Sequence, residues 1–257
     1  MKKNMFVVTH KKIDNIIPKE RSILLVGACN KDKIDEYFVD SNGDNISHKN
    51  KNFCELTGLY WMTKNCETDV LGLEHYRRFF ISRKFFFFKF PFLTDKKVEK
   101  ILNKYDVIVP KKSLWEDTIY NEYGKGHVLS DLDEVKNIIE NKCPEYLSAF
   151  NEVVVKGHYA YMLNMFIGKK EVIEKYANWL FSILFELENK IDISNRDTYQ
   201  ARVYGFLSER LFAVFLAKNS EIKICEKPVQ LIESNSASKC QILKIKRKLA
   251  RIFKKEV

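Results

Sequence analysis

The chain has 257 residues, 46% of them hydrophobic and 13% aromatic, so it can bury a full core and is not a disordered polypeptide. Its six cysteines contain no CxxC pair, and no apolar leader with a cleavage site follows Met1, which favours free thiols in a reducing cytoplasm. The longest apolar runs fall far short of the ~20 residues that a membrane-spanning helix needs.

Short apolar runs alternate with longer helical patterns, which predicts an α/β fold with a mainly parallel central sheet flanked by helices. The predicted strands are 5–9, 23–27, 70–73, 106–109, 164–168 and 222–225. The predicted helices are 54–65, 95–104, 131–141, 170–189, 198–218 and a basic C-terminal segment. One α/β domain is expected over 1–233, followed by a tail over 234–257.

Candidate ligand-binding residues follow the first two predicted strands. His10 and Lys11 come directly after the first strand, and Gly27 ends the second in the run ILLVGACN. Because ligands of open α/β sheets bind beyond the carboxyl ends of the strands, these residues could contact a base or a phosphate. A lone glycine is a weak signal, and the chain has no GxGxxG motif and no P-loop.

Clustered cations follow the third predicted strand. The buried run at 70–73 leads into Glu74, His75, Arg77 and Arg78. Paired guanidinium groups match phosphate oxygens with two hydrogen bonds each, so this strand end predicts an anion site suited to a nucleotide diphosphate. The alternative is that both arginines belong to a solvated turn and that the imidazole is a packed ring.

Six phenylalanines occur between Phe85 and Phe92, in the run FFFFKFPF, with cations on both sides. A core strand explains them. A hairpin that enters a membrane interface or meets a lipid-linked substrate explains them equally well, because Pro91 and the flanking cations suit an exposed loop.

Further candidates follow in the second half of the chain. His127 lies in the glycine-flanked run GKGHVLSD, where it is a candidate general acid or base, and Asp131 follows it. Asp131 and Asp133 form an acidic pair that could hold a metal-bound diphosphate, but a capped helix start, where the dipole favours carboxylates, is the preferred explanation. Asn164 is either a ligand for a sugar hydroxyl or a turn residue. Arg202 and Glu209 are two turns apart on one predicted helix and are expected to share a face.

An inverting sugar transfer needs a carboxylate or imidazole base near the acceptor hydroxyl. His127, Asp131 and Glu209 are the candidates, and the sequence does not choose among them. No motif with metal-ligand spacing is present, so no cofactor is expected.

The net charge of +10 is concentrated at the end of the chain, because the last 19 residues carry +7. Ile242, Ile245, Leu249 and Ile252 recur there at helical spacing among the lysines, which predicts a basic amphipathic helix suited to an anionic membrane surface. The alternative is that the apolar stripe packs on the domain.

Several motifs together resemble one bacterial family, DUF4422, which is found in capsule and exopolysaccharide gene clusters as glycosyltransferases. The motifs are His10-Lys11, VGA at 26–28, DNIS at 44–47, CELTGLYW at 54–61, LGLEHYRRFF at 71–80, DVIVPKK at 106–112, NMFI at 164–167, WLFSILFELE at 179–188, IDIS at 191–194 and QARVYGFLSERL at 200–211. The resemblance implies a GT-A-like nucleotide-sugar fold in which HYRR stands where a metal-binding acidic motif is usual.

The resemblance also implies transfer from a uridine diphosphate (UDP) sugar with inversion, and galactofuranose transfer in part of the family. It adds Asp44 and Asn45 to the donor-binding candidates, which are otherwise His10, Lys11, Gly27, His75, Arg77, Arg78, Asn164 and Arg202.

The sequence therefore predicts a cytoplasmic glycosyltransferase, peripheral on the inner face of the plasma membrane. It would move a hexose from a UDP-sugar to a lipid-linked glycan during capsule, exopolysaccharide or lipopolysaccharide synthesis. The alternative is a non-catalytic module that binds nucleic acid or another anionic partner through the basic tail, but that reading does not explain the cations after the third strand.

Overall fold

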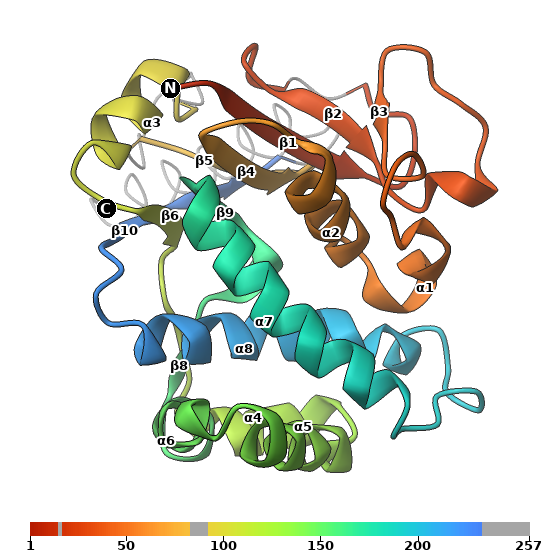
Figure 1. The fold of residues 1–257 in the computed structure, drawn as a ribbon, viewed down its shortest axis with the longest axis vertical. Coiled ribbons are helices and arrows are strands. Elements are labelled where there is room, and N and C mark those ends of the chain that lie inside the picture. The colour runs from red at the N-terminus through yellow and green to blue at the C-terminus, as the bar shows by residue number, and fades with distance from the viewer. Residues whose placement is uncertain (15–16, 83–91, 233–257) are drawn as a thin grey trace, which may run out of the picture.

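A computed structural model describes residues 1–14, 17–82 and 92–232 of the chain (Figure 1). The predictions for the basic tail and for all but the last residue of the phenylalanine run lie outside these residues. Within them, no helix combines the length and the apolar character that crossing a bilayer requires.

The strands are β1 (Lys3–Thr9), β2 (Ser22–Leu25), β3 (Phe38–Val39), β4 (Val70–His75), β5 (Arg78–Phe80), β6 (Val107–Pro110), β7 (Ser113–Leu114), β8 (Tyr159–Ala160), β9 (Phe166–Lys169), β10 (Ile224–Lys227) and β11 (Val229–Leu231). The α-helices are α1 (Asn50–Phe53), α2 (Leu56–Asn65), α3 (Asp95–Leu102), α4 (Ile119–Gly126), α5 (Leu129–Lys142), α6 (Leu147–Phe150), α7 (Lys170–Glu188) and α8 (Val203–Lys218).

The central sheet has the strand order β10-β6-β9-β4-β1-β2-β3. Strand β1 is parallel to both β2 and β4, and β10 is parallel to β6, whereas β9 is antiparallel to its neighbours β4 and β6. The predicted mainly parallel sheet is confirmed. Because Phe166 at the start of β9 pairs with Leu73 near the end of β4, the residues that precede β9 lie at the carboxyl edge of β4.

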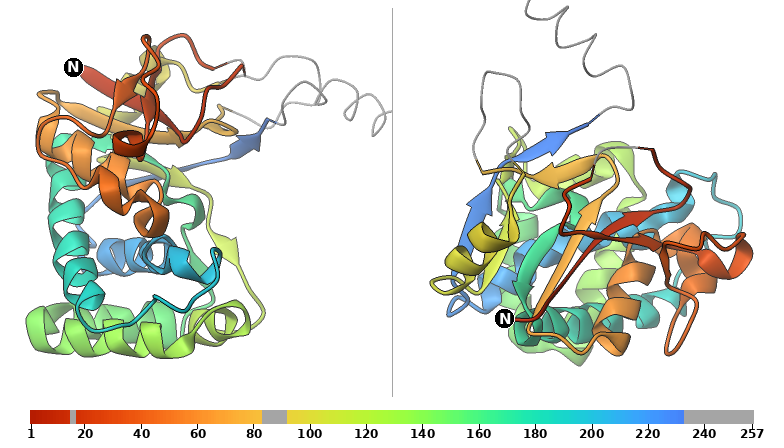
Figure 2. Two further views of the ribbon diagram at one scale, coloured as in Figure 1. Left: turned by 90° about the vertical axis from the view of Figure 1, so that its right-hand side faces the viewer. Right: turned by 90° about the horizontal axis from the view of Figure 1, so that it is seen from above.

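Alternating side chains divide the sheet between two cores. Phe6 and Leu71 belong to a large cluster with α2, α7 and α8, whereas Met5 and Val70, which precede them by one residue, pack with α3 on the opposite face. Figures 1 and 2 show the resulting layers: the sheet, then α7 and α8, and then α4, α5 and α6 farthest from the sheet.

Helix α4 occupies a segment that the sequence predicts as a glycine-flanked loop. Thr118 caps it by accepting a hydrogen bond from the amide of Asn121 at 3.2 Å, and Ile119 and Tyr123, one turn apart, are both buried. Each glycine in a helix costs about 1 kcal/mol relative to alanine, but packing of the apolar face overrides that preference. His127 lies in the two-residue connection between α4 and α5, so its predicted place in a loop holds, although the glycines before it are helical.

Candidate functional site

Cations from four separate segments surround His10 at the carboxyl edge of β1. Burial lowers the pKa of His10, and the charges of Lys31, Lys11, Arg77 and Arg202 lower it further. The lowered pKa favours the neutral imidazole, and the charges of all four cations reach this one ring. The structure thus brings together four of the predicted donor-binding residues and adds Lys31, which the sequence analysis did not single out.

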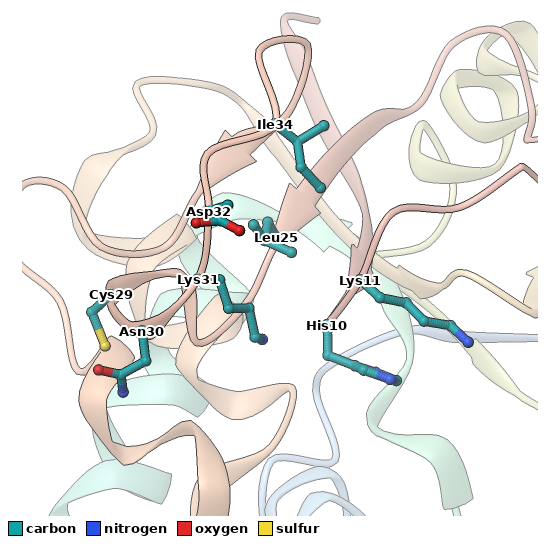
Figure 3. Close-up of a pocket in the computed structure, with 8 residues that line it drawn as sticks. All are labelled: His10, Lys11, Leu25, Cys29, Asn30, Lys31, Asp32 and Ile34. Carbon is teal, nitrogen blue, oxygen red and sulfur yellow. The ribbon is translucent and has the colours of Figure 1, made fainter.

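An open groove of about 670 Å³ lies at these residues. It is lined by His10 and Lys11 from the end of β1 and by the segment 29–32 and Ile34 after β2, with Leu25 between them (Figure 3). Figure 3 shows His10 and Lys11 on one side of the groove and Lys31 on the other. Lys31 donates to the carbonyl of Val26 and feels the charge of Asp40, while the ammonium group of Lys11 lies 5.8 Å from the centroid of the Tyr76 ring.

Gly27 fixes the backbone turn beside the groove, but its amide is used within the protein and does not donate to a ligand. Its φ is +65°, and a Cβ atom there would lie 2.6 Å from Oδ1 of Asn50, so the turn requires glycine. Its amide and that of Ala28 donate to the buried carboxylate of Asp40 at 2.9 and 3.0 Å. The hydroxyls of Ser47 and Thr57 also donate to Asp40, which therefore fixes the segment that carries Lys31.

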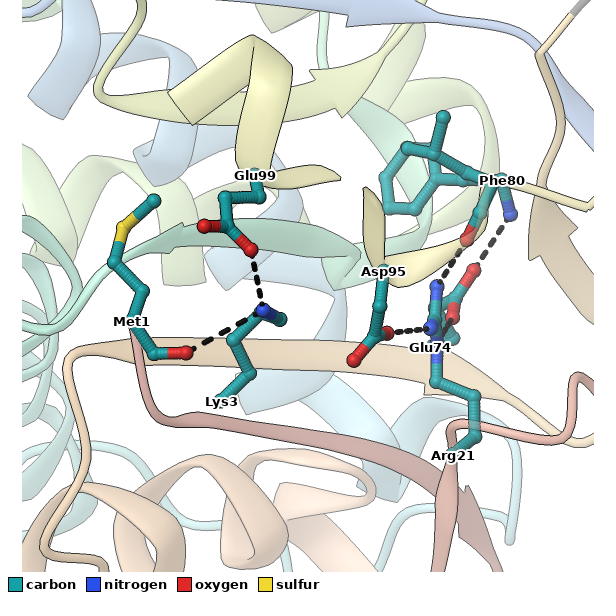
Figure 4. Close-up of polar contacts among 8 residues, drawn as sticks. Met1, Lys3, Arg21, Glu74, Phe80, Asp95 and Glu99 are labelled. Atoms are coloured by element: carbon teal, nitrogen blue, oxygen red, sulfur yellow. Dashed lines mark hydrogen bonds and ion pairs between the residues drawn. The ribbon is translucent and has the colours of Figure 1, made fainter. Parts of the chain in front are cut away.

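A buried ion pair fixes the turn between β4 and β5. Glu74 is 1% exposed, binds the guanidinium of Arg21 and accepts the amide of Phe80 at 2.6 Å (Figure 4). Arg21 also donates to the carbonyl of Leu93 at 3.0 Å. Burial raises the pKa of Glu74, and Arg21 opposes that shift. Glu74 thus holds the backbone that presents His75, Arg77 and Arg78.

The two arginines of this turn act on different neighbouring groups. Arg77 is exposed, stacks on the ring of Tyr76 with its guanidinium carbon 4.9 Å from the centroid, and influences His10. Arg78 instead influences the pKa of Glu209. The two arginines therefore do not act as one bidentate phosphate clamp: the charge of Arg77 acts on His10, whereas the charge of Arg78 acts on Glu209.

One ring nitrogen of His75, Nε2, is used in a hydrogen bond within the protein. Its Nε2 lies 2.6 Å from the carbonyl oxygen of Leu163, and because a carbonyl only accepts, this nitrogen carries a proton and donates. The amide of the same residue, Leu163, donates to Oε1 of Glu209 at 2.7 Å. One peptide segment is thus held from both sides by His75 and Glu209.

Asn164 lies in a strained turn, not at the start of a strand as predicted. Its φ is 49° and that of Leu163 is 84°, values that are rare for residues other than glycine. The amide nitrogen of Asn164 donates to Oε1 of Glu55 at 2.6 Å and to a backbone carbonyl, and its oxygen accepts from Ser208 at 2.9 Å. Both N–H donors of Asn164 are used inside the protein, so it positions the turn.

Glu209 is the carboxylate at the centre of this arrangement. Burial raises its pKa to about 7, with a further contribution from Glu55, while Arg210, the amide of Leu163 and Arg78 lower it. A carboxylate with a pKa near neutrality suits general base catalysis, because it is deprotonated at working pH and still binds a proton well.

Cys54 connects Glu209 with the cations of the groove. Arg202 donates to its sulfur at 3.2 Å, and both Arg202 and Glu209 influence the pKa of this thiol, which burial raises to about 11. Arg202 belongs to the 3-10 turn Gln200–Arg202 before α8 and not to the helix that carries Glu209, but both residues act on Cys54. Cys54, Leu163 and Asn164 are the non-glycine residues with positive φ in the described part, and all three adjoin this centre.

Residues 4–220 match the family described as domain of unknown function DUF4422. The chain belongs to this family. Among solved structures, the apo form of the bifunctional glycosyltransferase WbbM is similar, with a TM-score of 0.84 and 27% sequence identity. The similarity covers 91% of this chain and 46% of WbbM, so the chain spans about half of that protein. No curated protein matches.

The DUF4422 chain holds Asp131 in an ion pair. Both oxygens of this carboxylate bind the guanidinium of Arg196, at 2.5 and 2.7 Å, and its side chain is 2% exposed. Asp131 lies in the first turn of α5, but no side chain caps that helix. The carboxylate instead ties α5 to the segment that precedes α8. This geometry does not favour Asp131 as the base.

His127 lies in an aromatic cluster with Tyr123, Tyr199 and Phe206. Burial lowers the pKa of its imidazole, with a further effect of Arg210, and Nδ1 has no hydrogen-bond partner in the part of the chain that the structure describes. Arg210 lies between this cluster and Glu209, to which it donates at 3.0 Å. His127 is thus a neighbour of the Glu209 centre without a contact to it.

Asp44 and Asn45 lie away from the other candidates. Asp44 accepts from Tyr60 at 3.1 Å, and its amide donates to Asn65, the last residue of α2. The other end of α2 adjoins Glu55 and hence Asn164, and ten helical residues span about 15 Å. Asn45 accepts the amide of Ser47 within its own loop. Neither residue lines the groove, although Ser47, which Asn45 holds, accepts the amide of the groove residue Cys29 at 3.2 Å.

The described residues contain no group of three or more His, Cys, Asp or Glu side chains that could hold a metal ion. Three functional neighbours escaped the sequence analysis, namely Lys31, Glu55 and Asp40. Lys31 follows the run ILLVGACN and Glu55 opens the run ELTGLYW, so their places beside motifs were visible signals.

Proposed function

We propose that this chain is a glycosyltransferase that moves a hexose from a UDP-sugar to a glycan acceptor. The similarity to a bifunctional glycosyltransferase supports a transferase role in general. The observation that carries the proposal is the cationic groove at the carboxyl edge of the sheet, where Lys11, Lys31, Arg77 and Arg202 gather around His10.

These cations suit a nucleotide diphosphate. A diphosphate that leaves during transfer gains negative charge, and cations held in place before the reaction stabilise that charge without reorganisation. Arg77 and Arg202 would contact the phosphate oxygens through their planar donor forks, and Lys11 and Lys31 would act as point charges. The neutral His10 adds no repulsion between the ring and these cations.

Glu209 is our candidate for the base. It would take the proton of an acceptor hydroxyl while that oxygen forms a bond to the anomeric carbon, and the bond from this carbon to the diphosphate would break with its electron pair leaving on UDP. Attack opposite to the leaving group inverts the anomeric carbon. Arg78 beside Glu209 would favour its ionised form before the proton arrives.

The proposal also names an acceptor for the sugar and a location in the cell. We propose a lipid-linked glycan of capsule, exopolysaccharide or lipopolysaccharide synthesis as acceptor, and galactofuranose as one donor sugar to test first. The positive charge of the tail supports a location in the cytoplasm, at an anionic membrane surface. Since cations supply the charge at the diphosphate, the transfer is proposed to need no metal ion.

A panel of UDP-sugars tests this function. Purified protein is incubated with each sugar, with and without chelator, while release of UDP and thermal shift are measured. We expect release from one sugar that persists in chelator. If chelator abolishes release, the metal-independent part of the proposal is wrong, and if no nucleotide sugar gives a shift or release, the transferase proposal is wrong.

A further inference from the structure

An exposed aromatic cluster lies next to the proposed reaction centre and has no role in donor binding. The rings of His127 and Tyr199 are stacked with centroids 5.7 Å apart and an interplanar angle of 16°. Phe206 packs against both, with its centroid 4.2 Å from that of His127 and 4.9 Å from that of Tyr199. We call these three side chains the aromatic platform.

The aromatic platform is open to solvent at one end. Tyr199 is 54% exposed and Val128, beside His127, is 37% exposed, although both are large apolar side chains. Gln200 donates to the carbonyl of Gly126 at 2.8 Å, which holds the segment of Tyr199 against the end of α4. An exposed ring that is fixed in this way is typical of a binding surface, since aromatic groups offer contact area at low entropic cost.

The aromatic platform is physically joined to the proposed base. Phe206 and Glu209 are three residues apart on α8 and therefore share a face of the helix. Arg210 donates both to the carbonyl of Phe206 at 2.8 Å and to Oε2 of Glu209 at 3.0 Å. Arg202, which adjoins the donor groove, stacks on Phe206 at 5.5 Å. Phe206 is thus a neighbour of both the donor groove and the base.

Two polar atoms behind the rings lack partners. Nδ1 of His127 and the hydroxyl of Tyr123 are buried and form no hydrogen bond with any residue that the structure describes, and the two ring centroids are 4.7 Å apart. Buried polar atoms are nearly always satisfied, so an unpaired pair at one place points to a hydroxyl, from water or from a ligand, that completes it.

We propose that the aromatic platform is the subsite for the sugar ring of the acceptor. This inference rests on the proposed function, because it assigns the second substrate of the same reaction. The apolar C–H face of a hexose would lie on the exposed ring of Tyr199, which Phe206 supports, and its hydroxyl edge would face His127 and Glu209. A bound sugar next to Glu209 would present a hydroxyl to the base, which the donor groove alone does not provide.

Saturation-transfer difference NMR with methyl β-glycosides of glucose, galactose and N-acetylglucosamine, on protein saturated with UDP, tests the proposal. We expect saturation of the C–H protons of at least one sugar. Tyr199→Ala should reduce that signal by about 3- to 10-fold, as loss of a stacked ring does, and Tyr199→Phe should retain it. Tyr105→Ala, which removes another exposed tyrosine ring, is the matched control.

Calorimetric titration of UDP separates the possible failures. Failure of the wild-type protein to bind UDP would overturn the proposed function itself. Normal UDP binding with an unchanged sugar signal in Tyr199→Ala, or with no signal from any of the three glycosides, would overturn the acceptor subsite alone.

Discussion

Replacing Glu209 by glutamine tests the reaction centre most directly, because two independent quantities should change in opposite directions. The variant keeps the size of the side chain and an oxygen that accepts the amide of Leu163, now 2.7 Å away. It removes the ability to take a proton. Loss of a general base lowers turnover by about 10²- to 10⁴-fold.

The same substitution should stabilise the fold at alkaline pH. The pKa of Glu209 rises from its ordinary value of 4.5 to about 7 in the folded protein, so folding costs free energy once this group must ionise. That cost is absent well below pH 4.5, grows as the pH rises through this window and is complete above pH 7. The linkage between protonation and folding gives this cost as about 1 kcal/mol at pH 5 and about 3 kcal/mol at pH 8.

Urea unfolding of wild-type and Glu209→Gln protein at pH 5 and pH 8, together with UDP release, measures both effects. The free energy of unfolding of the variant should exceed that of the wild type at pH 8 by clearly more than at pH 5. In the wild type, turnover should rise with pH up to about 7 and then level off. Glutamine protein that keeps turnover within tenfold of wild type would refute the role of Glu209, and an equal stability difference at both pH values would refute the raised pKa.

Three further substitutions examine the surroundings of this centre. Arg77→Ala should weaken UDP affinity by about 10- to 100-fold, because it removes charged hydrogen bonds. Calorimetry compares this variant with Lys175→Ala, which removes an exposed cation on α7 and should change UDP affinity by less than twofold. Equal UDP affinities of the two variants would contradict a role of Arg77 in UDP binding. Glu74→Gln removes the close counter-charge of the buried Arg21 guanidinium, which then keeps only Asp95 at 3.4 Å, and should lower the free energy of unfolding by about 3 kcal/mol in urea. A change below about 0.5 kcal/mol, the scatter of neutral surface substitutions, speaks against the pair. Asn164→Ala removes three hydrogen bonds from a strained turn and should reduce turnover with UDP affinity unchanged; a loss of UDP affinity instead would place this residue in the donor site.

The strands and the position of the site could be predicted because their signals are local. Apolar runs followed by charged residues mark strand ends, and parallel strands bring those ends to one edge of the sheet. His10, Lys11 and Arg77 were found in this way. Membership of DUF4422 also rested on short motifs that can be read without any knowledge of contacts.

The remaining parts depend on contacts between distant residues. The turn at Leu163 and Asn164 exists because His75 and Glu209, 88 and 46 residues from Leu163, hold its peptide groups. Similarly, Arg21 looks like any surface arginine until Glu74, 53 residues later, is placed beside it. No local pattern contains these pairings, so the roles of Asn164 and His75 could not be derived from it.

The reversed direction of β9 has a consequence for how specificity can be altered. The segments after β1 and β2, within the first 34 residues, line the donor groove, whereas the turn before β9 and helix α8 carry Leu163 and Glu209 of the proposed reaction centre. The donor groove and the reaction centre therefore belong to largely separate stretches of chain. Exchanging residues 111–165 and 195–201 between members of the family should transplant the choice of acceptor while the nucleotide preference stays with the recipient.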